Sequence, residues 1–162
     1  MKFILAVVAA LWVGPAMAAG CEKPAGGAAL EAGLLVWINQ ERAGLGLKPY
    51  VRSAKLDRAA AAHACDMAVR NYFAHTGPGE ASLGPRIKAT GYGLRAADEN
   101  IAFTQQQQVT SVAPIWRNSP PHWAAIVNSS LHDIGISVTM GNGRVYWVMD
   151  AARSGLPFII LP

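Results

Sequence analysis

Charged residues are few in this 162-residue chain: they make up 15% of it, against about 25% in an average globular domain. Hydrophobic residues reach 52%, which excludes an intrinsically disordered protein or a coiled coil, because both need many more charges. The 16 Gly and 10 Pro residues require many turns and argue against a simple helical bundle. The length predicts a single domain.

Clusters of basic residues are also missing. The 14 Lys and Arg residues outnumber the 10 Asp and Glu residues, but they are scattered rather than arranged in the basic stripe of a nucleic-acid binder. The chain has no glycine-rich phosphate loop, no Gly-x-Ser-x-Gly elbow and no cysteine cluster with zinc spacing. We therefore expect no nucleic-acid partner and none of the enzyme classes that these motifs mark.

Only one long apolar run is present, at residues 3–13, and its 11 residues fall short of the roughly 20 that a transmembrane helix needs. The run follows Met1-Lys2 and precedes Ala16-Met17-Ala18, a group of small residues of the kind that signal peptidase cleaves. We therefore predict a signal peptide over residues 1–18, export to the periplasm or the medium, and no transmembrane segment.

Export determines how the two cysteines are interpreted. Two cysteines in a small domain in an oxidising compartment favour a disulfide, here between Cys21 and Cys65. An alternative treats residues 18–21 as a lipoprotein signal with a lipid anchor on Cys21. That alternative leaves Cys65 without a partner, and it places Ala18 where such signals usually have Leu.

After a leader at residues 19–27, hydrophobic periodicity predicts one domain over residues 28–155, followed by a tail at 156–162. Apolar residues recur at helical spacing from Leu30 until Gly44. A second, Ala-rich helix is expected from Ser53, its predicted N-cap, to about Asn71. A short helix over residues 83–90 follows.

The second half of the domain is expected to end in a β-hairpin. Residues 134–138 and 145–149 alternate between apolar and other residues around Gly141-Asn142-Gly143, a strong turn signal. Before them we predict a buried strand at residues 100–103, a helix at 109–118 that is interrupted at Pro114, and a short turn from Ser119. Helices first and a hairpin last predict an α+β fold.

The four histidines divide into two pairs. His63 shares the inner helix face with apolar residues and is expected to be buried and structural, while His132 is expected in a turn. His75 and His122 lie in loops rich in Gly, Pro and aromatic residues, and functional side chains concentrate in such loops. Glu99 lies between them, just before the predicted strand, where it is expected to be partly buried.

Two imidazoles and a carboxylate form a chemically sensible set. They could bind a divalent metal such as Zn²⁺, or they could act as general acid and base without a metal. The three residues are separated by 24 and 23 positions, which matches no metal-binding motif, so the spacing leaves both possibilities open.

Short motifs carry a family resemblance from Leu30 to Ala152. They are Asn39-Gln40-Glu41-Arg42, Gly46-Leu47-Lys48-Pro49, Leu56, Ala62-His63-Ala64-Cys65-Asp66-Met67-Ala68, Phe73-Ala74-His75-Thr76, Arg86-Ile87 with Gly91-Tyr92, Glu99-Asn100-Ile101-Ala102, Trp116 with Ser119-Pro120-Pro121-His122, and Tyr146-Trp147-Val148-Met149-Asp150. In this order they resemble the CAP superfamily, the SCP-like extracellular domains of cysteine-rich secretory, antigen 5 and pathogenesis-related 1 proteins. The likeness is greatest to the compact bacterial branch.

The resemblance implies a three-layer α-β-α sandwich with a small antiparallel sheet between helices. It also implies a cleft lined by two His and, in many eukaryotic members, two Glu. His75, Glu99 and His122 match three of these positions, and Ser119 stands where the second Glu would be. Family members are reported to bind divalent metals, sterols, fatty acids or peptides.

Three functions are consistent with these observations. The first is a secreted binding protein whose cleft holds a metal such as zinc, through His75, Glu99 and His122, or a small-molecule, lipid or peptide ligand. The second is a metal-assisted hydrolase of extracellular or envelope substrates, for which Ser119 is the one further candidate residue. The third is a structural or interaction protein with an inert cleft. We favour the first, because three cleft residues match and a signal peptide is predicted.

Overall fold

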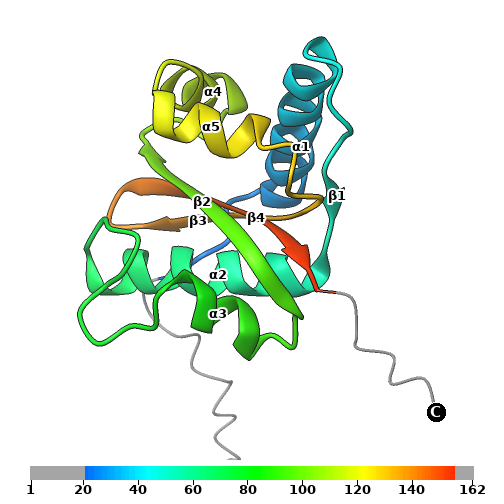
Figure 1. The fold of residues 1–162 in the computed structure, drawn as a ribbon. Helices are drawn as coiled ribbons and strands as arrows, with labels where there is room; N and C mark the ends of the chain where they lie inside the picture. Colours follow the sequence, from blue (N-terminus) through cyan, green and yellow to red (C-terminus); the bar gives the residue numbers. More distant parts are fainter. Residues whose placement is uncertain (1–20, 156–162) are drawn as a thin grey trace, which may run out of the picture.

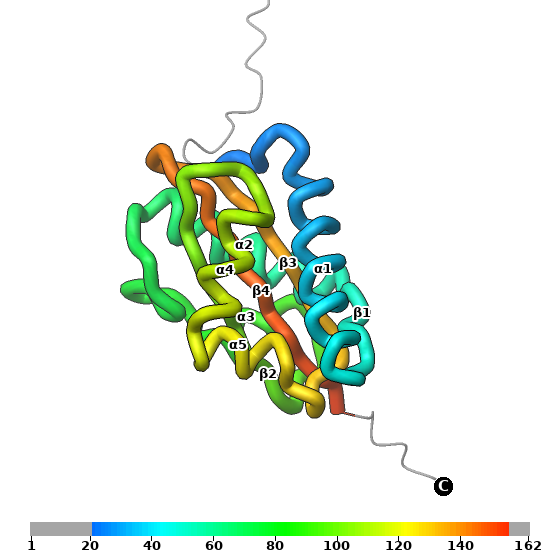
Figure 2. The backbone as a smooth tube through the Cα atoms, turned by 90° about the horizontal axis from the view of Figure 1, so that it is seen from above, coloured from blue at the N-terminus to red at the C-terminus, as the bar shows by residue number. Residues whose placement is uncertain are grey.

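A four-stranded sheet in the order β1-β3-β4-β2 forms the middle layer of the computed structural model, which describes residues 21–155 (Figure 1). The strands are β1 (Val51–Arg52), β2 (Leu94–Thr104), β3 (Asp133–Gly141) and β4 (Arg144–Ser154). One face is covered by α2 (Ala54–Arg70) and α3 (Leu83–Ala89), and the other by α1 (Gly27–Gly44), α4 (Val109–Arg117) and α5 (Pro120–Val127). Seen from above, α1 lies along β3, while α4 and α5 lie over β2 (Figure 2). The predicted α+β class and α-β-α sandwich are confirmed.

The predicted signal peptide (1–18) and tail (156–162) lie outside the described residues, as do the first two residues of the predicted leader. Between residues 21 and 155, none of the helices combines the length and the apolar composition needed to cross a bilayer.

The hairpin of β3 and β4 is confirmed and is longer than its sequence pattern indicates. Its register runs from Asp133 opposite Ala152 to Gly141 opposite Arg144. Asn142 and Gly143 connect the strands with φ angles of 51° and 70°, the positive values that both central residues of a type I′ turn require. Because helices cover both faces of the sheet, residues 145–152 of the central strand β4 are buried without interruption, and the polar-apolar alternation disappears there.

Small side chains let α2 approach the sheet closely. Its buried inner face includes Ala59, Ala60, Ala64 and Ala68. Opposite this face, a Cβ atom on Gly135 of β3 would come within 2.1 Å of the carbonyl carbon of Leu56. Ser53 occupies the N-cap position as predicted, but its side chain makes no capping hydrogen bond.

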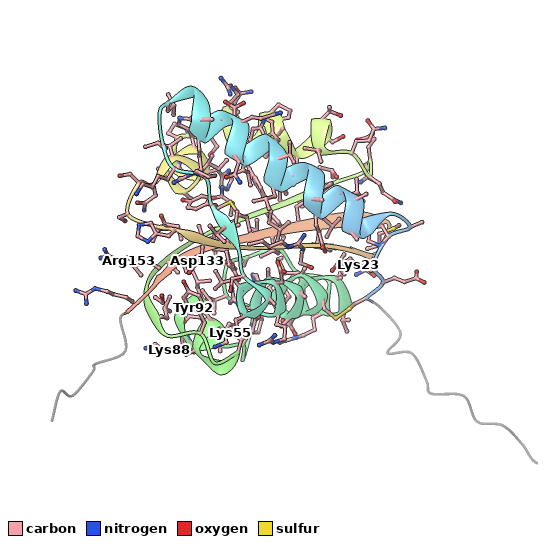
Figure 3. All side chains as sticks on the ribbon, turned by 90° about the vertical axis from the view of Figure 1, so that its right-hand side faces the viewer. Lys23, Lys55, Lys88, Tyr92, Asp133 and Arg153 are labelled. Atoms are coloured by element: carbon pink, nitrogen blue, oxygen red, sulfur yellow. A yellow bond between two sulfur atoms is a disulfide. The ribbon has the colours of Figure 1, made fainter. Side chains whose placement is uncertain are left out.

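The segment before α1 is fixed at two points. Cys21 is bonded to Cys65 of α2, with the Cα atoms 5.1 Å apart, so the predicted disulfide is present (Figure 3). A sulfur in this bond cannot also carry a lipid, so the disulfide favours the first of the two interpretations of Cys21. Glu22 adds to the outer edge of β3 through two backbone hydrogen bonds with Met140, of 3.1 and 2.6 Å.

Between Glu22 and β1, the outer edge of β3 bonds to carboxylates instead of a strand. The Ile136 N–H donates to Asp57 Oδ1 at 3.0 Å, and the Val138 N–H donates to Glu31 Oε1 at 3.4 Å. At the start of β3, β1 pairs in parallel with it over two residues. The two long strand pairs are antiparallel, as the predicted sheet requires, and this short parallel pair is an addition to it.

Three predicted elements differ from those observed. The strand predicted at residues 100–103 is the end of β2, which begins at Leu94; its first half was missed because it carries polar residues. The predicted interruption at Pro114 is wrong: α4 continues through it, and since Pro114 and Thr110 are both exposed, water can solvate the carbonyl that Pro114 leaves unbonded. The turn expected after Ser119 is a two-turn helix, α5, with Pro120 in its first turn.

Candidate functional site

An apolar cleft of about 400 Å³ opens between β2, the loop after α2, and the helices α4 and α5. Its lining residues are Phe73, Ala74, His75, Ile101, Ala102, Phe103, Ile115 and His122. The rings of Phe73 and Phe103 pack edge to face with their centres 5.0 Å apart, which stabilises the loop against β2. Phe73, Phe103 and Ile115 nevertheless stay exposed, so apolar surface borders the opening.

The two loop histidines of the sequence analysis meet in this cleft. His75 comes from the loop between α2 and α3, and His122 from the first turn of α5. The backbone carbonyl of His122 accepts a hydrogen bond from Asn100 Nδ2 at 2.9 Å, which ties α5 to β2. The structure thus brings His75 and His122, 47 positions apart in the chain, to one apolar wall.

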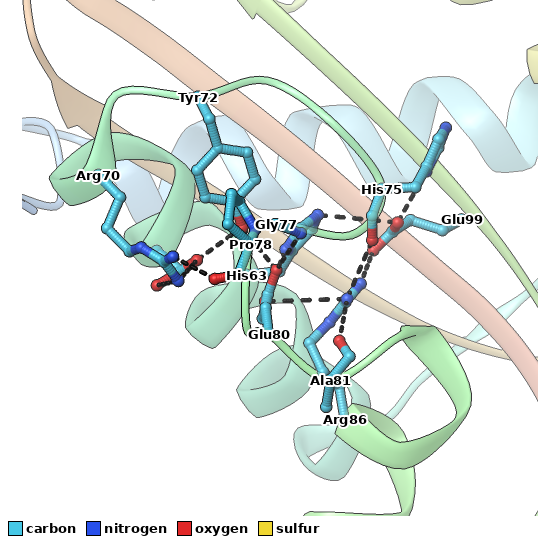
Figure 4. Close-up of polar contacts among 11 residues, drawn as sticks. His63, Arg70, Tyr72, His75, Gly77, Pro78, Glu80, Ala81, Arg86 and Glu99 are labelled. Carbon is cyan, nitrogen blue, oxygen red and sulfur yellow. Dashed lines mark hydrogen bonds and ion pairs between the residues drawn. The ribbon is translucent and has the colours of Figure 1, made fainter.

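Glu99 lies beneath the cleft and does not line it. Its side chain is only 2% exposed. His75 Nδ1 donates to Glu99 Oε1 at 2.8 Å, and Arg86 Nη2 donates to Glu99 Oε2 (Figure 4). The hydrogen bond to Glu99 raises the pKa of His75, an effect only partly offset by burial. Glu99 therefore orients the His75 ring and favours its protonated form.

His122 has the opposite character. Burial lowers its pKa, and the nearby charge of His75 lowers it further. His122 Nδ1 is buried and finds no hydrogen-bond partner among residues 21–155. The cleft thus pairs a readily protonated imidazole with a neutral one that has an unused buried nitrogen.

Ser119 occupies the N-cap position of α5, and its carbonyl accepts the Trp123 N–H at 2.8 Å. It is not among the residues that line the cleft. Ser119 is therefore close to His122 along the chain but does not line the cleft with the two histidines.

A polar cluster of His63, Tyr72, Glu80, Arg86 and Glu99 supports the site from below (Figure 4). His63 is fully buried, as predicted, but its surroundings are not apolar: Nδ1 donates to Glu80 Oε1 at 2.9 Å, and Nε2 lies 3.8 Å from Glu99 Oε1. Burial raises the pKa of Glu80, but hydrogen bonds from Tyr72, His63 and a backbone N–H outweigh it and lower the pKa overall.

Arg86 holds the loop that carries His75. It is buried, and Nη1 donates to the carbonyls of His75 and Ala81 at 3.1 and 2.9 Å, while Nη2 binds Glu99. Sequence reasoning did not assign Arg86 or Glu80 to the site, because no local pattern links them to Glu99 and their contacts depend on how the loop folds.

Asp150 was missed for a different reason. It is the cross-strand partner of Glu99, it is fully buried, and neither carboxyl oxygen has a hydrogen-bond partner within the described part of the chain. Burial and the charge of Glu99 raise the pKa of Asp150 well above its ordinary value, which favours the protonated form of this acid. Its position as the one acidic residue in the apolar run 145–152 was the sequence signal that could have identified it.

The predicted zinc ligands do not fit a three-ligand site in this arrangement. The described residues contain no group of three His, Cys, Asp or Glu side chains placed to hold one ion. Both oxygens of Glu99 are engaged by Arg86 and His75. Two imidazoles are left for a metal, with Glu99 as the hydrogen-bond partner of one of them.

Comparison with known proteins agrees with this architecture. The sequence pattern of the cysteine-rich secretory protein family, CAP, matches residues 37–151. The protein YkwD of Bacillus subtilis is 34% identical over 113 residues, which cover 70% of this chain and 44% of YkwD. The chain thus spans less than half the length of that relative.

Two bacterial crystal structures share the fold. An extracellular protein with an SCP domain from Bacillus anthracis has a TM-score of 0.73 at 23% identity, covering 79% of this chain and 41% of that one. An outer surface protein of Borrelia burgdorferi also has a TM-score of 0.73, at 20% identity, covering 78% and 94%. With the family pattern matched over most of its length, the chain belongs to the cysteine-rich secretory protein (CAP) family.

Proposed function

We propose that this protein is exported and binds an amphiphilic small molecule, of the fatty-acid class, in the cleft beside His75 and His122. The observation that carries the proposal is the composition of the cleft. Six of its eight lining residues are apolar, and the other two are the histidines. Small-molecule sites have this form: a mostly apolar cavity with a few polar groups that fix orientation.

The hydrocarbon part of such a ligand would lie against Phe73, Phe103 and Ile115. These side chains are partly exposed in the absence of ligand, so covering them removes apolar surface from water. Each buried methylene group contributes about 0.8 kcal/mol, which a chain of several methylenes multiplies into useful affinity. The cleft volume of about 400 Å³ lies in the range typical of small-molecule sites, roughly 300–1,000 Å³.

The head group would lie at the histidines. Protonated His75 favours an anionic group such as a carboxylate, and neutral His122 can donate or accept a hydrogen bond. The negative charge of Glu99 is compensated by Arg86, so it does not repel an anion at the cleft.

Three observations support action outside the cytoplasm. The sequence predicts a signal peptide, the Cys21–Cys65 disulfide suits an oxidising compartment, and the two structural relatives are described as extracellular or surface proteins. We propose no hydrolytic reaction, because among residues 21–155 the two histidines are the only cleft-lining residues with polar side chains, and Ser119 does not line the cleft.

Displacement of a fluorescent fatty acid from the purified protein tests the proposal. Ile115→Asp places a charge on the exposed rim of the cleft and should weaken binding at least tenfold. The matched control is Val36→Asp, because Val36 is also an exposed aliphatic residue but lies on α1 and does not line the cleft. Unchanged binding by Ile115→Asp, or an equal loss in Val36→Asp, would contradict the proposal.

A further inference from the structure

A second cavity, of about 300 Å³, lies between the loop that follows α1 and the turn that precedes β3. Its lining residues are Arg42, Gly46, Leu47, Lys48, Pro49, Ser129, Leu131 and His132. It shares no lining residue with the cleft of the histidines. Arg42 and residues 46–49, which belong to two motifs of the sequence analysis, line it and have no role in the proposed function.

Arg42 is the unusual residue of this cavity, because it is a charged residue with only 1% of its surface exposed. Its guanidinium carbon lies 3.6 Å from the centre of the Tyr50 ring. Nε donates to the carbonyl of Lys48 at 2.8 Å, and Nη1 donates to the carbonyls of Ile126 and Asn128 at 2.7 and 3.1 Å. These neutral acceptors hold the guanidinium in place but leave its charge uncompensated.

No carboxylate neutralises that charge. In the structure of residues 21–155, Arg42 forms no ion pair, and its three hydrogen bonds to backbone carbonyls come from Nε and Nη1. The neighbouring Glu41 pairs with Arg117 instead. A buried charge without a counter-ion is costly, and proteins usually pair it or use it to bind a ligand.

The lining contains a second cationic side chain and no acid. Lys48 lines the cavity together with the His132 ring, and no Asp or Glu residue is among its lining residues. Asp98, an acid on the adjoining strand β2, accepts a hydrogen bond from Asn128 Nδ2 at 2.8 Å and is not part of the lining. The cavity therefore attracts anions, with a fixed guanidinium at its wall.

We propose that this cavity is a binding site for a phosphate group. Arg42 Nη2 would be its central donor, the Lys48 ammonium would add charge, and the His132 ring could add an N–H donor. Guanidinium groups suit phosphate because their N–H donors match the tetrahedral oxygens in geometry and charge. The proposal is independent of fatty-acid binding in the cleft, because the two cavities have no residue in common.

Calorimetric titration with inorganic phosphate at low ionic strength tests the site. We expect saturable heat from the wild-type protein and affinity about tenfold lower for Lys48→Glu, which reverses one charge of the cavity. The matched control, Lys88→Glu, changes an exposed lysine of α3 in the same way and should bind like wild type. Arg42→Gln should abolish binding, but it also removes the bonds that hold α1, so Lys48→Glu decides.

A second arm replaces phosphate with vesicles that contain phosphatidylglycerol. Binding of either probe that Lys48→Glu weakens and Lys88→Glu does not supports the site and shows whether the phosphate is free or part of a lipid. Absence of saturable binding to both probes, or an equal effect of the two lysine variants, overturns the proposal. Fatty-acid displacement from the same samples should be unaffected by Lys48→Glu, so failure of one proposal is distinguishable from failure of the other.

Discussion

Replacing Glu99 by Gln tests whether the negative charge of this buried side chain, and not only its size and shape, holds Arg86 and His75 in place. Gln keeps the size and one carbonyl acceptor, but it removes the charge that faces Arg86 and His75. Removing one partner of a buried ion pair generally costs about 3–5 kcal/mol. Arg86 keeps two backbone carbonyls and the more distant Glu80, so we expect a loss at or just below the lower end of this range, about 2–3 kcal/mol, in urea unfolding at pH 7.

The same substitution should move the titration of His75. In the wild type, the hydrogen bond to Glu99 raises the pKa of His75 above its unfolded value. That pair therefore stabilises the folded state below the unfolded pKa, and its contribution is lost as the pH rises through the folded pKa. In Glu99→Gln, the pKa of His75 should fall, and this part of the pH dependence of unfolding should disappear.

NMR titration of the His75 ring protons, together with urea unfolding between pH 5 and 9, provides both measurements. Glu80→Gln is the matched control, because Glu80 bonds to His63 and Tyr72 but not to His75. It should leave the titration of His75 unchanged. If His75 titrates at the same pH in the wild type and in Glu99→Gln, the inference that Glu99 sets its protonation is wrong.

Three further predictions follow from the fold and the site. The Cys21→Ser/Cys65→Ser double variant should lose about 4 kcal/mol in urea unfolding, because the disulfide closes a loop with a sequence separation of 44; an equally stable variant would contradict the chain-entropy argument. Gly135→Ala should lower the free energy of unfolding by at least about 2 kcal/mol, because the added methyl group clashes with α2. Gly93→Ala is the control: its methyl group meets open space, and the loss should be less than about 1 kcal/mol. Similar melting temperatures for the two variants would show that α2 can shift freely. Zn²⁺ should bind weakly in calorimetry, because two imidazoles are available rather than three ligands; tight binding lost in His122→Ala would mean that Glu99 leaves Arg86 to join the metal.

Local sequence patterns predict the parts of this fold that local interactions determine. The apolar spacing from Leu30 to Gly44 and the Asn142-Gly143 turn each specify an element through contacts within a few residues. The strand predicted at residues 100–103 is shorter than β2, because an edge strand tolerates polar residues such as Arg95 and the first half of β2 therefore has the sequence pattern of a loop. Its pairing with β4, rather than its own composition, makes it a strand.

The residues of the candidate site also fall into those that the sequence predicts and those that only the structure reveals. His75 and His122 were found because polar residues in loops among Gly, Pro and aromatic residues stand out. Glu80 and Arg86 were not, because their role depends on how the loop folds back over His63. The separation of Glu99 from the cleft lining also required the structure, since sequence spacing cannot distinguish a ligand-facing carboxylate from one that faces an arginine.

The carboxylate-capped edge of β3 bears on how two copies of this protein could meet. An incoming chain would pair with Ile136 and Val138 only after displacing Asp57 and Glu31 from their N–H groups. The largely buried Glu31 would then lose a donor without regaining water, which makes the exchange unfavourable. Side chains from two helices thus bond to N–H groups that would otherwise be open to a further strand. They protect this edge of the sheet against the edge-to-edge pairing that leads to fibrils.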